Sequence, residues 1–342
     1  MSSAVDIEDL TAEWLSQVLG SDVGSVTAEA IGTGQTAASY RLTLDAPGRP
    51  RTLVAKVATG PQDSRRSVAG GYRRVVGLYA DLATTLAVRI PHCWHAAITD
   101  DGLRFTLLLE DLAPRTPGVQ VDGCSPGRAR AAGGNLAGLH ASRWDDETLF
   151  ALPYLDPPAA RASFMGELTV RCADVFLERY RDRLDAADVE TLRRSAAAVE
   201  RWYPGDLEPL ALLHGDYRLD NLMFGAADDD VVAIDWQTLA VGPPGRDLAY
   251  FAAISLPAGT RSTVEETLVA DYHAALLARG VEYTLDDCRR DYRRGALQAP
   301  MIAMIGAALS SAERSSAADV MFLSMAERAC AAVRELGTLD LV

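Results

Sequence analysis

Hydrophobic and polar residues follow two different rhythms along this chain. Alternation with a period of two, which is typical of strands, occurs in the first third together with two helical stretches, and a helical spacing of about 3.6 residues dominates the rest. The alternating stretches predict strands at 26–31, from Tyr40 onward, at 53–58, at 94–98 and at 105–112. Helical spacing predicts helices at 6–19, 63–86, 125–144, 167–184, 187–203, 246–254, 262–279, 284–309 and 316–336. A sheet-rich first part followed by a larger helical part predicts an α+β fold.

Two short apolar runs interrupt the helical pattern of the second part. The first, at 210–213, leads into a loop that begins His214-Gly215-Asp216. Asn221 follows five residues after Asp216, and the second run, at 231–234, leads directly to Asp235. Two short strands are therefore predicted to present an Asp, an Asn and another Asp at their ends.

This order of side chains suits phosphoryl transfer. The triphosphate of a nucleotide needs Mg²⁺, which prefers oxygen ligands, and the acceptor hydroxyl needs a carboxylate that orients it and takes its proton. Asp216 fits the base, and Asn221 and Asp235 fit the metal ligands. An Asp and an Asn at this spacing are by themselves common in turns, because both side chains bond to nearby backbone. Here both residues follow a predicted strand, and a Gly/Asp-rich turn at 225–230 then leads into the second strand, which ends at Asp235. This order favours the chemical interpretation.

One lysine stands out in the first third of the chain. Lys56 lies in the apolar stretch L-V-A-K-V at 53–57 and is the only lysine among the 33 basic residues. Such a strand lysine matches the type that pairs with nucleotide phosphates. A lysine that extends from an edge strand into solvent is the structural alternative. Upstream, Gly32 and Gly34 open a turn whose backbone N–H groups can approach phosphates, although a plain β-hairpin carries the same glycines.

Composition bounds the size and class of the protein. At 342 residues and 49% hydrophobic content the chain can bury a substantial core, and its length suggests two lobes or two domains. The formal charge of -14, from 47 acidic and 33 basic residues, argues against a nucleic-acid partner, which requires clustered positive charge. Five cysteines without C-x-x-C spacing predict neither a disulfide framework nor a zinc site, and they favour a reducing compartment.

The sequence predicts neither a signal peptide nor a membrane span. The N-terminal segment MSSAVDIEDLTAEWL contains acidic residues and has the apolar spacing of a helix, where a signal peptide has a basic segment followed by an apolar one. The uncharged run 295–312 reaches membrane-spanning length, but it contains Gln298 and Pro300 and follows an Arg-rich helix, so a buried helix is expected. The expected location is cytoplasmic, with neither nucleic acid nor membrane as a partner.

The loop and the strand after it resemble a known family. The stretch from His214 reads H-G-D-x-x-x-x-N and is followed by I-D-W-Q at 234–237, where protein kinases have H-R-D-x-x-x-x-N and D-F-G. These motifs resemble the small-molecule branch of the kinase superfamily: aminoglycoside phosphotransferases, choline kinases and the ecdysteroid-kinase-like group. The resemblance implies ATP and Mg²⁺ as cofactors and a protein-kinase-like two-lobed fold. It would comprise a small antiparallel sheet lobe (1–109), a hinge (110–115) and a mainly helical lobe (116–342).

The resemblance also implies how a nucleotide would be held. Lys56, together with the turn that contains Gly32 and Gly34, would contact the phosphates. Glu110 begins an E-D pair similar to the one that relatives carry at the hinge, and it would lie beside the nucleotide. For Asp111, an ordinary acidic turn after a strand is an equally good interpretation.

Two further residues near the catalytic stretch gain roles in the same way. Arg218 stands where many kinases have a lysine near the transferring phosphate, so it would stabilise developing charge. An ion pair between Arg218 and Asp220 explains it equally well. Asp247, in G-R-D-L-A-Y, is similar to the family's G-x-D-L-A element and would brace the catalytic loop through hydrogen bonds.

The sequence departs from the kinase pattern at the helix after Lys56. Kinases pair the strand lysine with a Glu of this helix, but here Val75 occupies that place, and no Glu occurs anywhere in 59–103. Either Asp63 or Asp81 reaches Lys56 instead, or the lysine functions without an acidic partner on this helix. The departure supports an alternative function, a pseudokinase that binds nucleotide or acts as a scaffold without transfer.

The distance between two acidic residues indicates the class of acceptor. Eleven residues separate Asp235 from Asp247, too few for the activation segment with which protein kinases grip a peptide. The expected acceptor is therefore a hydroxyl group on a small molecule, whether sterol-like, aminoglycoside-like or another hydroxylated metabolite. The expected enzyme is a small-molecule kinase.

Overall fold

The computed structural model describes residues 4–32, 37–205, 209–310 and 316–342. The chain forms two compact units. The first comprises Met1–Thr85, Ile90–Pro114 and Ile234–Leu239, and the second comprises Leu86–Arg89, Arg115–Ala233 and Ala240–Val342. The sequence-based division at 110–115 placed 234–239 in the larger lobe, whereas these residues pack within the first unit, with the helix that follows Lys56.

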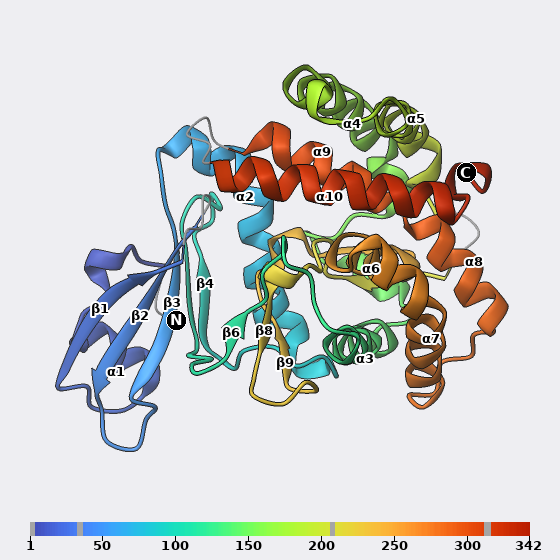
Figure 1. The fold of residues 1–342 in the computed structure, drawn as a ribbon. Coiled ribbons are helices and arrows are strands. Elements are labelled where there is room, and N and C mark those ends of the chain that lie inside the picture. Colours follow the sequence, from blue (N-terminus) through green and yellow to red (C-terminus); the bar gives the residue numbers. More distant parts are fainter. Residues whose placement is uncertain (1–3, 33–36, 206–208, 311–315) are drawn as a thin grey trace. The chain divides into compact units, whose positions relative to one another are not determined.

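The first unit is built on a five-stranded sheet in which every neighbouring pair of strands is antiparallel (Figure 1). Its strands, in the spatial order β1-β2-β3-β5-β4, span Ser25–Ile31 (β1), Ala37–Asp45 (β2), Thr52–Ala58 (β3), Phe105–Glu110 (β5) and Cys93–Ile98 (β4). Lys56 of β3 lies opposite Ser39 of β2 on one side and Leu107 of β5 on the other. Because β3 is a central strand, an edge-strand lysine is excluded as the explanation of Lys56.

The two faces of this sheet pack against different helices. On β5, Leu108 packs in a core cluster with Leu15 of α1 (Ala12–Leu19), whereas the ring of Phe105 lies 4.7 Å from that of Tyr72 of α2 (Gln62–Gly77). Successive residues of a strand point to opposite faces. Lys56 alternates with the β3 residues that join the α1 cluster, so it points to the face that α2 covers.

The helices α1 and α2 of the first unit are shorter than the sequence pattern predicts. α1 begins only at Ala12, where Thr11 caps it, and a 3-10 turn precedes it. α2 ends at Gly77 and continues as a π-helical turn over Leu78–Leu82 and a 3-10 turn over Ala83–Thr85. The predicted helices 6–19 and 63–86 were too long because apolar spacing does not separate single turns of these kinds from an α-helix.

The second unit is mainly helical. Its helices are α3 (Pro126–Ser142), α4 (Pro158–Tyr180), α5 (Ala186–Trp202), α6 (Gly245–Ser255), α7 (Ala258–Leu277), α8 (Leu285–Gly295), α9 (Gln298–Leu309) and α10 (Ser316–Glu335). α4 and α5 lie side by side, joined by a short connection (Figure 1). α4 begins well before the predicted start at Glu167. The predicted helix 284–309 is two helices, because Pro300 lacks a backbone N–H and fits the first turn of a new helix, not the interior of a long one.

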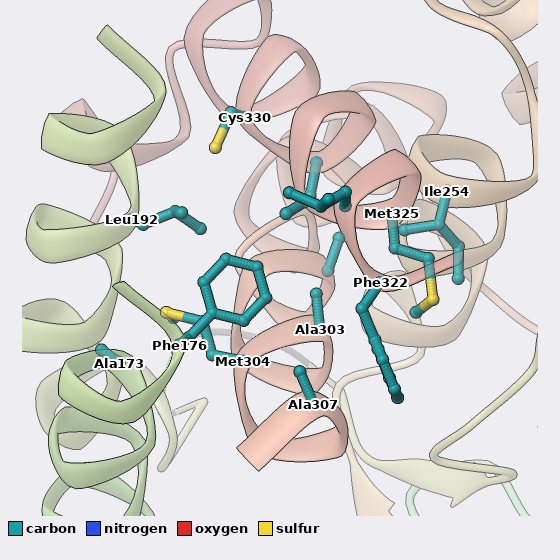
Figure 2. Close-up of a cluster of buried hydrophobic side chains, with 14 of the residues drawn as sticks. Ala173, Phe176, Leu192, Ile254, Ala303, Met304, Ala307, Phe322, Met325 and Cys330 are labelled. Atoms are coloured by element: carbon teal, nitrogen blue, oxygen red, sulfur yellow. The ribbon is translucent and has the colours of Figure 1, made fainter. Parts of the chain in front are cut away.

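The core of the second unit lies among α4, α5, α6, α9 and α10 (Figure 2). Phe176 of α4, Leu192 of α5, Ile254 of α6, Met304 of α9 and Met325 of α10 are all buried in it. Each large apolar side chain that is removed from water contributes about 1.5–3 kcal/mol. α6 is buried along its whole length, so the residues that it carries are held rigidly.

Within the uncharged run 295–312, for which a buried helix was predicted, residues 298–309 form α9, and most of this helix is buried. Residues 311 and 312 of the run lie outside the described residues. Within the ranges that the structure describes, every helix is too short or too polar to cross a bilayer.

Two small antiparallel sheets complete the second unit. β7 (Ala211–Leu213) pairs with β10 (Ala240–Gly242), and β8 (Leu222–Phe224) lies between β6 (Thr116–Pro117) and β9 (Val231–Ala233). β7 and β9 are the two apolar runs from which strands were predicted. The loop 214–221 therefore connects two short strands, and β10 leads into α6.

Candidate active site

The loop after β7 holds the carboxylate of Asp216 through hydrogen bonds from its own residues and from α6. Asn221 Nδ2 donates to the backbone oxygen of Asp216 at 2.9 Å and to its Oδ2 at 3.0 Å. The hydroxyl of Tyr250, on α6, donates to Oδ1 of Asp216 at 2.6 Å. The Asp216 side chain is 24% exposed. The structure therefore combines a fixed carboxylate orientation with access from solvent.

Arg218 contacts two carboxylates. Its Nε lies 3.3 Å from Oδ2 of Asp216, and its Nη1 contacts the carboxylate of Asp220. Burial would lower the pKa of Arg218, but the charges of Asp216 and Asp220 outweigh burial and raise that pKa above its ordinary value. The guanidinium is therefore held in its charged form. Both interpretations from the sequence retain support, because Arg218 pairs with Asp220 and also lies beside the candidate base.

Asp247, buried on α6, holds the backbone of the loop. Its carboxylate accepts hydrogen bonds from the N–H groups of His214 at 2.6 Å and of Gly215 at 3.0 Å, so the predicted bracing role is confirmed. Gly215 has a φ of 81°, a left-handed value that glycine adopts without steric penalty. His140 Nε2 lies 3.5 Å from the same carboxylate, and His140 Nδ1 lies 2.7 Å from the hydroxyl of Tyr272.

A second brace comes from Gln120, which the sequence analysis did not identify. The side-chain Oε1 of Gln120 accepts a hydrogen bond from the backbone N–H of Leu219 at 3.0 Å. The backbone N–H of Gln120 donates to Oδ1 of Asp220 at 3.1 Å. Arg328 of α10 in turn donates to the carbonyl oxygen of Gln120 at 3.1 Å. A glutamine in a Pro/Gly-rich loop is ordinary, so nothing in the local sequence indicated this contact.

In the first unit, Lys56 and Asp235 form an ion pair. Lys56 Nζ lies 2.8 Å from Oδ1 of Asp235, and the two side chains are 14% and 44% exposed. Asp235 has a φ of 62° and a ψ of 73°, in the left-handed region that Asp tolerates better than most residues. The structure thus brings together the residue predicted to contact phosphate and one of those predicted to hold the metal.

The partner of Lys56 in this ion pair, Asp235, is not one of the two residues that were expected from the sequence, Asp63 and Asp81. Asp63 pairs with Arg66 and is 97% exposed, and Val75 is buried. α2 approaches the segment after Asp235 through Gly71 instead. A Cβ atom at Gly71 would lie 3.3 Å from both Cβ and the backbone oxygen of Gln237, so glycine permits this close approach.

The predicted hinge residues make structural contacts. Oε2 of Glu110 accepts a hydrogen bond from the N–H of His92 at 3.0 Å. Asp111 accepts hydrogen bonds from Nε and Nη2 of Arg41, at 2.7 and 3.1 Å. Burial would raise the pKa of Asp111, but the hydrogen bonds from Arg41 and from the Ala113 N–H hold that pKa below its usual value.

The glycine turn is only partly within the described residues. Gly32, after the end of β1, has a φ of 74°, and a Cβ built there would meet no atom within 4 Å. Gly34 lies outside the described residues.

Tyr250 is the contact of Asp216 that sequence reasoning missed. It lies three residues after Asp247 on a predicted helix, and residues at that spacing share a helix face. Periodicity therefore placed Tyr250 on the same side as a predicted brace, and this was the available signal. Burial raises the pKa of Tyr250 well above its ordinary value, so its hydroxyl keeps its proton and acts as a donor.

Residues 27–283 match the protein family described as the phosphotransferase enzyme family. Curated proteins match over shorter stretches. Acyl-CoA dehydrogenase family member 11 from Gallus gallus is 34% identical over 74 residues, which are 21% of this chain and 10% of that protein. Acyl-CoA dehydrogenase family member 10 from Mus musculus is 32% identical over 89 residues, 25% of this chain and 8% of that protein. The similarity thus covers about a tenth of the length of these relatives.

Solved structures match over almost the whole chain. The choline kinase from Cryptosporidium parvum has a TM-score of 0.60 at 11% identity, covering 93% of this chain and 91% of that chain. The ethanolamine kinase from Plasmodium vivax has a TM-score of 0.56 at 12% identity, covering 90% and 83%. The GDP and kanamycin complex of APH(2")-IIia has a TM-score of 0.56 at 15% identity, covering 92% and 96%. The predicted kinase-like α+β fold is confirmed.

Proposed function

The chain belongs to the phosphotransferase enzyme family, and on that premise we propose that it transfers the terminal phosphoryl group of ATP to a hydroxyl group of a small molecule. In this reaction the acceptor oxygen forms a bond to the terminal phosphorus while the bond to the bridging oxygen breaks, and a nucleoside diphosphate leaves. The observation that carries the proposal is the loop 214–221, which holds the carboxylate of Asp216 in one orientation and leaves it accessible.

Asp216 is the proposed base. It would accept a hydrogen bond from the acceptor hydroxyl, orient it, and take its proton as the new oxygen–phosphorus bond forms. Its own partners, Tyr250 and Asn221, are donors, so they hold the carboxylate without competing for the proton. Arg218, in its charged form beside Asp216, is proposed to stabilise negative charge on the transferring group.

Asn221 and Asp235 are the proposed ligands of Mg²⁺. Asn221 directs its amide nitrogen to Asp216, which leaves its amide oxygen for a metal ion. Among the described residues, no three His, Cys, Asp or Glu side chains gather as a metal site. A nucleotide-bound Mg²⁺ uses only one or two protein oxygens, because phosphate oxygens and water complete its shell, and a carboxylate and an amide oxygen are donors of the kind that it takes. When bound, the ion would neutralise part of the charge on the phosphates.

The remaining nucleotide contacts are proposed in the first unit. Lys56 is an ammonium on a central strand, and it would exchange part of its interaction with Asp235 for phosphate oxygens. Gly32 has open space where a side chain would be, which allows backbone N–H groups to approach a phosphate. Glu110, at the end of β5, is proposed to lie beside the nucleotide without binding it through its carboxylate, because that carboxylate accepts a hydrogen bond from the backbone N–H of His92.

The acceptor is proposed to be a small hydroxylated molecule. The names of the similar solved structures include a choline kinase, an ethanolamine kinase and a complex with kanamycin. The short segment between Asp235 and Asp247 supports the same class, because it is too short to grip a peptide. These observations favour testing amino alcohols and aminoglycosides first. Sterols, the further class that the sequence resemblance implies, complete the panel.

The decisive experiment measures acceptor-dependent release of nucleoside diphosphate. The purified chain is incubated with Mg²⁺, with ATP or GTP, and with each acceptor of the panel. We expect release with at least one acceptor, lost in Asp216→Ala and retained in Asp228→Ala, whose side chain is 65% exposed. Nucleotide binding without release on any acceptor would instead support the pseudokinase alternative.

A second experiment tests the metal assignment. Calorimetry would measure nucleotide binding with and without Mg²⁺ for the wild type and for Asp235→Asn, which keeps a side chain that tolerates the left-handed backbone. Asp63→Asn, in the same unit and exposed, is the matched control. We expect Mg²⁺-dependent binding that weakens in Asp235→Asn alone. Equal affinities in all three proteins would contradict Asp235 as a ligand.

A further inference from the structure

The hydrogen bonds to Asp216 are distributed unevenly over its two carboxylate oxygens. Oδ2 faces Asn221 Nδ2 at 3.0 Å and Arg218 Nε at 3.3 Å, both from the same loop. Oδ1 accepts from Tyr250 at 2.6 Å, and this bond comes from α6, a buried helix of the core. A carboxylate offers about two acceptor positions on each oxygen. The contacts on Oδ2 occupy both of its positions, whereas Oδ1 keeps one beside the Tyr250 hydroxyl.

The carboxylate plane of an aspartate is not fixed by its own torsional preference. Rotation about the last bond of the side chain is broad, because it joins an sp³ to an sp² carbon. Contacts on Oδ2 alone would come from a single loop. The bond from Tyr250 adds a second point of attachment on a rigid element, and two points on opposite oxygens define the plane.

We propose that Tyr250 is a positioning residue for phosphoryl transfer: its hydroxyl fixes the carboxylate plane of Asp216, so that the free position on Oδ1 is the one that meets the acceptor hydroxyl. The inference rests on the proposed function of Asp216 as the base. Tyr250 acts through Asp216 and binds neither nucleotide nor acceptor. Loss of its hydroxyl should therefore slow the transfer step and leave the binding of both substrates unchanged.

The chain contains a matched control for this residue. The hydroxyl of Tyr283 donates to Oδ2 of Asp291 at 2.6 Å, the same kind of bond at the same length. Asp291 lies on α8, outside the loop 214–221. Tyr283→Phe thus removes the same atom from an equivalent tyrosine–aspartate pair that has no place in the proposed mechanism.

The kinetic test compares Tyr250→Phe with Tyr283→Phe. A misplaced base lowers the rate of the chemical step, and we expect kcat of Tyr250→Phe to fall about tenfold to a hundredfold. The KM values for the nucleotide and for the acceptor should stay within about twofold of the wild type, because the substitution removes no contact to either substrate. Tyr283→Phe should retain kcat within about twofold of the wild type, because its loss acts on stability only. Equal kcat values in the two variants, or a raised KM at unchanged kcat, would overturn the proposal.

A spectroscopic measurement separates this inference from the proposed function. The hydroxyl proton of Tyr250, buried and in a short bond, should exchange slowly enough to be observed by NMR in protein with labelled tyrosine. We expect its resonance to shift in Asp216→Asn and to remain in place in Asp228→Asn, whose carboxylate is exposed and pairs with Arg128. An unresponsive resonance would overturn the proposal even if transfer is observed. If the resonance responds but the protein transfers phosphate to no acceptor, the hydrogen bond between Tyr250 and Asp216 is supported and the proposed function is contradicted.

Discussion

Two carboxylates carry the candidate chemistry, and the two units hold them differently. Asp216, in the second unit, accepts hydrogen bonds from its own loop and from the buried helix α6, and Asp247 holds the loop backbone. Asp235, in the first unit, is the more exposed of the two, has a left-handed backbone, and pairs with Lys56.

The difference matches the tasks that we propose. A base must keep one orientation through the reaction, because misplacement of a reacting group by about 1 Å can lower the rate a hundredfold. A metal ligand and a phosphate-binding lysine have to change partners when a nucleotide arrives, so a partly exposed ion pair suits them. We therefore call the site of Asp216 in the second unit pre-organised, and the Lys56–Asp235 pair in the first unit responsive, because its partners would change on nucleotide binding.

The largest expected effect follows from changing the pre-organised carboxylate itself. Asp216→Asn keeps the shape of the side chain but removes its basicity, and kcat should fall about a thousandfold, within the range of a lost general base. Nucleotide affinity, measured by calorimetry, should change less than twofold. Asp228→Asn serves as the control. A variant that retains more than about a tenth of wild-type kcat would show that Asp216 is not the base.

Removing the brace should destabilise the second unit. Asp247→Ala leaves two backbone N–H groups without their acceptor and takes a carboxylate from beside His140, all in the buried interior. We expect a loss of about 3 kcal/mol in the free energy of unfolding, which urea denaturation would measure. A loss below about 1 kcal/mol would mean that the loop does not depend on α6.

The close crossing of α6 and α8 gives a smaller effect of the same kind. A Cβ atom at Gly245 would lie 2.3 Å from the backbone oxygen of Asp291, so Gly245→Ala must separate the two helices. Such overpacking typically costs about 1–3 kcal/mol. Gly134→Ala in α3, where a Cβ would meet nothing within 4 Å, should be neutral or stabilising by up to about 1 kcal/mol. Equal midpoints in thermal unfolding would contradict the close packing.

The responsive pair in the first unit should contribute least to stability. Lys56→Met removes an ion pair whose acidic partner is 44% exposed, and solvent screening limits the expected loss to about 1 kcal/mol or less. Nucleotide affinity should nevertheless fall about tenfold, because a buried charge–phosphate contact is worth more than an exposed pair. A loss of stability as large as that of Asp247→Ala would show that Lys56 is structural, and the contrast between the two sites would fail.

Much of the candidate site was readable in the sequence because its members are close along the chain. Asn221 follows Asp216 by five residues on a loop bounded by two short strands, so local structure alone brings them together. The same motifs led to the family and the enzyme class, a phosphotransferase, and both are confirmed by the family match. Helix ends were less predictable, as α2 and α8 show, because single π and 3-10 turns and a helix break between Gly295 and Gln298 preserve the apolar spacing.

The sequence by itself determined the set of chemical groups and their order: the loop with Asp216, the strand with Lys56 and the helix with Asp247. Only the tertiary structure decided their partners. Tyr250 meets Asp216 across 34 residues, and Lys56 meets Asp235 across 179. Such contacts depend on which faces of distant elements pack together. The periodicity of a local stretch shows which of its faces is buried, but it does not show which distant residue packs against that face.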